Sequence, residues 1–135
     1  MLTTIDDKWT GATRMALVER VKYAITHPSH GLVGLVDELL VSCLEIGLEM
    51  EWQAKGCRAR FYFDDDSELH LNLPLRKSVL RAIIARVAEL CQQQSRQSVS
   101  HYEGQTELTI PGDPERRLHV AYVNTPDVQQ LKLAR

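Results

Sequence analysis

The apolar residues in the first third of the chain recur at spacings of three and four, the period of one helical face. They predict a first helix over residues 12–26, whose face is Met15, Val18, Val21 and Ile25. Pro28 disfavours helix in the residue before it, so a second helix begins after Ser29, its expected N-cap, and ends at Gly47. The second helix is expected to be the most buried, with the face Leu32, Leu35, Val36, Leu39, Leu40, Cys43 and Ile46.

After Gly47 the pattern changes to an alternation of apolar and polar residues, which is typical of strands with one buried face. Three such strands follow one another, at residues 48–54, 57–63 and 69–73. Pro74 ends the last of them, because proline has no N–H to donate to a sheet. The short connections between these segments predict an antiparallel meander.

The turn between the first two strands sets their predicted register. A two-residue turn at Lys55-Gly56 places Met50 opposite Phe61 on the buried side of the hairpin. On the outer side the same register places Glu51 opposite Arg60. Apolar residues then face apolar residues and an acid faces a base, which is the favourable arrangement for cross-strand pairs.

The remaining chain predicts a third helix and a second group of strands. The helical period returns over residues 75–93, with the face Val79, Leu80, Ile83, Ile84, Val87, Leu90 and Cys91. Strands are predicted at residues 98–102, 106–110 and 118–123, with a short segment at 128–133, a turn at 103–104 and a loop at 111–114. This order predicts an α+β fold: a mainly antiparallel sheet, made of a three-stranded meander plus three or four C-terminal strands, with helices packed on one face.

The composition predicts one globular domain over residues 1–135, since 44% of the residues are apolar and 25% are charged. A net charge of −2 offers no basic surface for nucleic acid. No apolar run reaches the about 18 residues of a membrane span, and the N-terminus lacks a secretory signal pattern, so we expect a cytoplasmic protein without membrane insertion. Cys43, Cys57 and Cys91 fall on apolar faces and are expected to be buried, reduced thiols.

The sequence shows no complete catalytic, cofactor or metal site. The glycines do not form a phosphate-binding loop, so we expect no cofactor. His27 and His30 lie beside the helix break without the further ligands that a metal site needs. The run Asp64-Asp65-Asp66 also lacks further ligands and is expected to be a solvated turn between two strands.

The outer face of the predicted meander carries the residues with the greatest potential for binding. Its middle strand provides Arg58, Arg60 and Tyr62, and the neighbouring strands provide Glu49, Glu51, His70 and Asn72. Arginine and tyrosine are favoured in protein interfaces. We therefore predict a partner-binding surface made of Arg58, Arg60, Tyr62, Glu51 and His70. The alternatives are a solvated face whose charges pair internally, and a small enzyme that acts through Tyr62, His70 and Glu49.

Several motifs follow one another in order after Leu32. A helix ends at Gly47, a strand reads Arg58-Ala59-Arg60-Phe61-Tyr62-Phe63-Asp64-Asp65, and a further strand ends at Leu73-Pro74. Next come the helix Ala82-Ile83-Ile84-Ala85-Arg86-Val87-Ala88, the pair Glu103-Gly104, and closing strands on either side of Pro126. This order resembles the N-terminal, PAS-like domain of the ATPases of type II secretion and type IV pilus assembly. The resemblance covers residues 31–135 and leaves residues 1–30 as an N-terminal helical extension.

The resemblance implies a stand-alone, diverged copy of that domain. In the family a nucleotide-binding domain follows, with a phosphate loop and acidic metal and histidine boxes, and Arg135 stands where that domain would begin. The family's N-terminal domain also directs two arginines toward the nucleotide. The matching positions here are Tyr62 and Ala121, and neither residue can stabilise a transferring phosphoryl group as arginine does. The expected function is a non-catalytic protein-interaction or regulatory module, whose partner is a protein such as a component of a secretion or pilus machine.

The alternative function is that of a small cytosolic chaperone of the kind that serves type III secretion, which has a similar order of elements. Such chaperones form dimers and hold an extended effector segment, often by strand addition. They close with a helix, whereas residues 128–133 here read as a strand. The sequence leaves open the identity of the partner, the oligomeric state (a dimer included), the role of residues 1–30 and the binding of a small ligand.

Overall fold

The computed structural model describes residues 11–28, 30–95, 99–110 and 112–135. Over these residues the chain forms three helices and six strands. The helices are α1 (Gly11–Thr26), α2 (Gly31–Ser42) and α3 (Lys77–Gln94). The strands are β1 (Gly47–Gln53), β2 (Gly56–Tyr62), β3 (Glu68–Leu73), β4 (Glu103–Ile110), β5 (Asp113–Asn124) and β6 (Gln129–Ala134).

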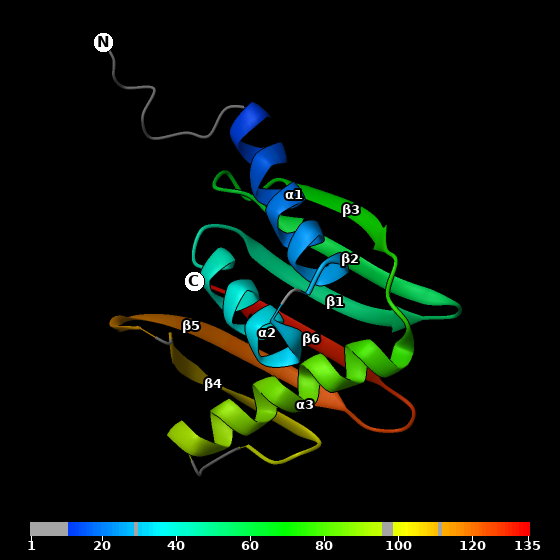
Figure 1. Ribbon diagram of the computed structural model, residues 1–135, viewed down its shortest axis with the longest axis vertical. Helices are drawn as coiled ribbons and strands as arrows, with labels where there is room; N and C mark the ends of the chain where they lie inside the picture. Colours follow the sequence, from blue (N-terminus) through cyan, green and yellow to red (C-terminus); the bar gives the residue numbers. More distant parts are fainter. Residues whose placement is uncertain (1–10, 29, 96–98, 111) are drawn as a thin grey trace.

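The described strands form one six-stranded sheet in the order β3-β2-β1-β6-β5-β4, and all neighbours are antiparallel. The N-terminal and C-terminal groups of strands meet where β6 pairs with β1 and Met50 faces Leu131. The three helices lie on the near side of the sheet in Figure 1. The prediction of an α+β fold with helices on one face of a mainly antiparallel sheet is therefore confirmed.

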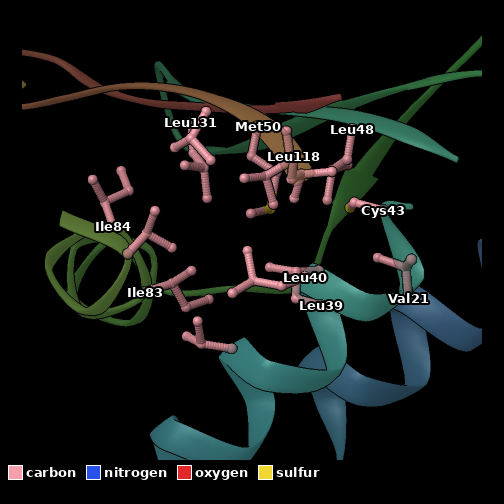
Figure 2. Packing of buried hydrophobic residues seen from close by; sticks show 14 of the residues in the cluster. Val21, Leu39, Leu40, Cys43, Leu48, Met50, Ile83, Ile84, Leu118 and Leu131 are labelled. Carbon is pink, nitrogen blue, oxygen red and sulfur yellow. The ribbon is translucent and has the colours of Figure 1, made fainter. Parts of the chain in front are cut away.

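The hydrophobic core lies between the sheet and the helices, and Figure 2 shows side chains from both layers pointing toward each other. The labelled residues come from α1 (Val21), α2 and its C-cap (Leu39, Leu40, Cys43), α3 (Ile83, Ile84) and the strands (Leu48, Met50, Leu118, Leu131). Because Val21 belongs to the same buried cluster, the helical part of the predicted N-terminal extension is built into this core. The helices of the described residues are too short or too polar to cross a membrane.

The bounds of α1 match the predicted helix, but one predicted face residue in each of α1 and α2 is exposed, and α2 ends earlier than predicted. Met15 is 50% exposed, because it lies about 120° around α1 from the buried Val21. The α2 helix ends at Ser42 and not at Gly47, although the residues that follow it remain partly in the core. Its N-cap residue His30 makes no side-chain cap, and Ser29, the predicted cap, lies outside the described residues. Leu32 is 39% exposed, because burial along α2 begins one turn later, at Leu35.

The β1–β2 hairpin has a different register from the predicted one. Its turn consists of Ala54 and Lys55, and Gly56 is the first residue of β2, opposite Gln53. Ala54 has a positive φ of 50°, the conformation that the first residue of a type II′ turn requires. The register therefore shifts by two residues, which leaves every side chain on its predicted face but changes its partner.

The predicted strand at 98–102 is wrong over the described residues 99–102. Val99 makes an isolated bridge to Gly104, and the N–H of Ser100 donates to the carbonyl of Glu103 at 2.8 Å, so the chain turns there. The predicted turn at 103–104 is instead the start of β4. Ser98 lies outside the described residues.

The last two strands are longer or more central than the sequence indicates. β5 begins at Asp113, inside the predicted loop at 111–114, of which Pro111 lies outside the described residues. β6 matches the predicted segment at 128–133 and lies between β1 and β5. The closing segment thus joins the two groups of strands into one sheet.

Candidate functional site

The face of the sheet opposite the helices is uncovered over the described residues. The alternation of buried and exposed residues along each strand places one set of side chains on this outer face. We call it the outer face. It carries all five predicted partner-binding residues, namely Arg58, Arg60, Tyr62, Glu51 and His70.

Arg60, Tyr62 and Glu49 form the centre of the outer face on the β1–β2 side. The Arg60 guanidinium donates to the Tyr62 hydroxyl at 3.0 Å, and that hydroxyl donates to a Glu49 carboxylate oxygen at 3.5 Å. Arg60 also lies 3.8 Å from Glu49. The hydrogen bond with Tyr62, supported by the nearby carboxylates, raises the pKa of Arg60 above its ordinary value. Arg60 therefore stays charged.

His70 and Glu68 extend this cluster onto β3. The Arg60 Nε atom lies 3.6 Å from Glu68, and the His70 Nε2 atom lies 2.9 Å from the same carboxylate oxygen. The two pairs are exposed by about 40% or more at the side chain, so solvent weakens them. Of the three residues in the alternative enzyme hypothesis, Tyr62 and Glu49 share a hydrogen bond, whereas the hydrogen bond of the His70 ring is with Glu68.

Glu51 and Arg58 are opposite one another but do not form an ion pair. The Glu51 carboxylate accepts hydrogen bonds from Gln53 at 2.6 Å and from Gln130 of β6 at 3.2 Å. Arg58 is exposed and has no carboxylate within ion-pair distance among the described residues. The hollow beside it, which reaches Glu49 and His70, measures only ≈ 40 Å³. That volume is small beside the several hundred Å³ of ordinary ligand pockets.

Larger hollows lie on the other half of the outer face, over β4, β5 and β6. Two of them, of ≈ 500 Å³ and ≈ 440 Å³, adjoin and share Gln105, Ala121 and Lys132. The small side chain of Ala121 is part of the floor, and Glu49 at the edge of the first hollow connects it to the Arg60 cluster. The outer face therefore combines a charged, aromatic cluster with an adjoining shallow depression.

Lys132 connects the two halves of the outer face and is not among the residues predicted to bind a partner. Its ammonium lies 5.9 Å from the centre of the Tyr62 ring, a cation–π distance, and it is opposite Glu49 on β1 and Ala121 on β5. No carboxylate lies within ion-pair distance of Lys132 among the described residues. The alternation in residues 128–133 places Lys132 on the polar face, but sequence alone does not pair that strand with β1.

The cysteines are buried and free, as predicted. Burial raises the pKa of Cys43 far above its ordinary value, and it raises the pKa of Cys57 and Cys91 to about 11. Such thiols are poor nucleophiles at neutral pH. Among the described residues, no group of three or more His, Cys, Asp or Glu side chains is placed to hold a metal ion.

The acidic run Asp64-Asp65-Asp66 is an exposed turn between β2 and β3, as predicted, and two of its carboxylates also contact α1. The Arg14 guanidinium of α1 lies 3.1 Å from Asp64 and 2.9 Å from Asp65, and its Cζ atom lies 5.1 Å from the centre of the Phe63 ring. The β2–β3 loop is thereby bound to α1. Asp64 and Asp65 thus help to hold the loop against the helix. The sequence does not reveal this contact, because Arg14 and Asp64 are 50 residues apart.

Comparison of the chain with protein-family models, curated proteins and solved structures found no match.

Proposed function

We propose that this chain is a non-catalytic protein-binding module and that its partner binds the outer face. The observation that carries the proposal is the position of Lys132, an exposed cation that lines both hollows over β4, β5 and β6 without a carboxylate partner among the described residues. On the same half Glu107 contacts both Arg117 and His119, and Glu103 lines the first hollow together with Lys132. A partner that brings a carboxylate to Lys132 supplies the ion pair that this cation lacks among the described residues.

The chemistry of the outer face defines the kind of partner. The shallow depression between Gln105 and Lys132 fits an extended segment or a loop of another protein, with small apolar side chains over Ala121. The adjacent Arg60 and Tyr62 are residue types that contribute strongly to protein interfaces. The proposed partner is therefore a protein that presents an acidic residue within a segment of small apolar residues.

The relation to the N-terminal domain of secretion and pilus-assembly ATPases is part of this proposal. Its support is the ordered set of sequence motifs between Leu32 and the closing strands. At the two positions where that family directs arginines toward the nucleotide, this chain has Tyr62, which is bound to Arg60, and Ala121, which lies in the hollow. Both differences from the family are expected for a domain of this kind that binds a protein and no nucleotide.

Site-specific cross-linking in cells tests the proposed surface. A photo-reactive amino acid at Gln105, which lines both hollows, is expected to form a covalent adduct with a partner protein, and one at the exposed Glu38 of α2 is not. Lys132→Glu should reduce the Gln105 adduct by about tenfold or more, the effect of losing one buried charge contact. The matched control Lys77→Glu makes the same charge change on the exposed N-terminus of α3 and should leave the adduct unchanged.

Titration of the purified chain with ATP and magnesium tests the absence of nucleotide binding. No saturable heat is expected at micromolar concentrations, because Tyr62 and Ala121 carry no cation for a phosphate. Saturable binding would contradict the non-catalytic part of the proposal. The cross-linking experiment tests the partner-binding surface independently of this result. For the chaperone alternative, the described residues supply no specific support, and residues 129–134 form the strand β6.

A further inference from the structure

The edge of the sheet at β3 has free backbone hydrogen-bonding groups. The N–H of Phe63 donates to the carbonyl of Ser67 at 2.9 Å, so these residues form a hydrogen-bonded pair. Such pairs alternate along an antiparallel ladder, and the β2–β3 register then directs the backbone groups of Leu69, Leu71 and Leu73 toward β2. The backbone N–H and C=O groups of Glu68, His70 and Asn72 point away from the sheet. None of them has a hydrogen-bond partner among the described residues.

The opposite edge, at β4, is closed at both ends by the chain itself. The side-chain amide of Gln94 accepts from the N–H of Thr109 at 2.7 Å and donates to its carbonyl at 3.1 Å. Ser100 binds both the carbonyl and the N–H of Glu103, at 2.8 and 3.2 Å. Proteins protect the edge strands that must stay unpaired, because a free edge is a template for another strand. The contrast points to β3 as the edge that accepts one.

We propose that a second copy of this chain adds antiparallel to the β3 edge, with His70 opposite His70 of the second copy. In this register Glu68 lies opposite Asn72 of the second copy, and all three outward residues of each strand form hydrogen-bonded pairs. A register shifted by two residues would lose at least one of the three pairs. A register shifted by one would place apolar side chains opposite polar ones.

The side chains of β3 suit this symmetric pairing. Leu69 and Leu71 are only half-buried on the helix side of the sheet. In the dimer Leu69 of one copy lies opposite Leu71 of the second copy, so the pairing covers both side chains. On the outer face Arg58 of β2 lies opposite Asn72 of β3. In the dimer Asn72 in turn lies opposite Glu68 of the second copy, so Arg58, Asn72 and that Glu68 follow one another across the three strands. The dimer therefore brings Arg58 toward the exposed carboxylate of Glu68 of the second copy. Arg58 has no carboxylate partner among the described residues.

A dimer of this kind leaves the outer face free. The symmetry axis is perpendicular to the sheet, so the helices of both copies lie on one side and both outer faces on the other. Lys132 is three strands from the β3 edge in the order of the sheet. Dimer formation is thus independent of the partner binding proposed above, and Lys132→Glu should leave it unchanged.

Cysteine cross-linking in the full chain tests the register. Cα atoms in an antiparallel hydrogen-bonded pair lie about 5.5 Å apart, within the range of a disulfide, so His70→Cys should give a disulfide-linked dimer under mild oxidation. The native cysteines are buried and should not contribute. Asn72→Cys is the matched control, because the two copies of residue 72 would be about 13 Å apart along the strands and should not cross-link. Cross-linking through residue 72, or none through residue 70 in a folded variant, overturns the proposed pairing.

The mass in solution, from light scattering over a series of concentrations, provides the second test. The unsubstituted chain should approach the dimer mass as its concentration rises. His70→Pro removes an outward N–H that the β2–β3 ladder does not use, so it should give a folded monomer. Glu107→Pro makes the equivalent change on the β4 edge and should leave the dimer intact. A chain that is monomeric at about 1 mM, or a dimer that His70→Pro does not weaken, contradicts the proposal.

Discussion

The hydroxyl of Tyr122 donates a hydrogen bond of 2.6 Å to the carbonyl oxygen of Ser100. Tyr122 is 2% exposed on β5, and Ser100 belongs to the turn that precedes β4. The contact crosses Gly104, where an added Cβ would lie 2.6 Å from the Tyr122 oxygen and 2.8 Å from the Cγ1 atom of Val99. Gly104 therefore permits the turn to pack over the tyrosine that connects it to the sheet.

Gly104→Ala should destabilise the protein by about 1–3 kcal/mol, the usual cost of overpacking a close contact. The matched control is Gly56→Ala, because a Cβ at Gly56 meets nothing within 4 Å. Urea unfolding followed by circular dichroism measures both changes. Equal midpoints for the two variants would show that the Tyr122–Ser100 contact does not confine residue 104.

Arg14→Met should lower the unfolding midpoint at neutral pH, because it releases Asp64 and Asp65 from α1. Hydrogen bonds from Ser67, followed by the Arg14 guanidinium, hold the pKa of Asp65 far below its ordinary value. A depressed carboxylate pKa adds stability above pH about 4 that is lost as the pH falls below it. The difference between Arg14→Met and the native chain should thus shrink in acid.

The control for this prediction is Arg20→Met, which removes the exposed Arg20–Glu45 pair. Exposed pairs contribute little, so its midpoint should stay close to that of the native chain at every pH. Thermal unfolding at pH 7 and pH 3 compares the variants. A pH-independent loss in Arg14→Met would assign its effect to packing on Phe63 and not to the carboxylates.

The native thiols should not react with a thiol reagent at pH 8 in the folded chain. Cys57 and Cys91 have pKa values of about 11 because they are buried, and the pKa of Cys43 is higher still. Since an unfolded thiol ionises near pH 8.5, stability should fall as the pH rises from about 8.5 toward 11. Reagent kinetics with and without denaturant measure the accessibility. A fast native phase would contradict the burial of one of these residues.

Much of the architecture followed from periodicity. The alternation after Gly47 identified β1, β2 and β3, and the helical stripe around Ile83 identified α3. Those signals work because each element buries one face, so its hydrophobic period records its geometry. Turns were predicted less well. The positive φ falls on Ala54 and not on the neighbouring Gly56, so the β1–β2 register shifted by two residues.

The candidate site was only half visible in the sequence. Arg60 and Tyr62 were placed together because they are two residues apart on one strand. Lys132 was not, because its closeness to Tyr62 depends on β6 entering the sheet beside β1, a pairing between distant segments. The contact of Arg14 with Asp64 was hidden for the same reason. Local pattern gives the face on which a residue lies but not its neighbours from other parts of the chain.

Gln94→Ala should open the C-terminal end of the β4 edge. The Gln94 amide binds both backbone groups of Thr109, so its loss should cost about 1 kcal/mol and speed amide hydrogen exchange at Thr109. Gln93→Ala is the matched control, since Gln93 is the exposed neighbour on the same helix and makes no such contact. Exchange at Leu108, whose backbone faces β5, should change little in either variant. Equal exchange at Thr109 in the two variants would mean that Gln94 does not protect this edge, and β4 would then be open to another strand as β3 is.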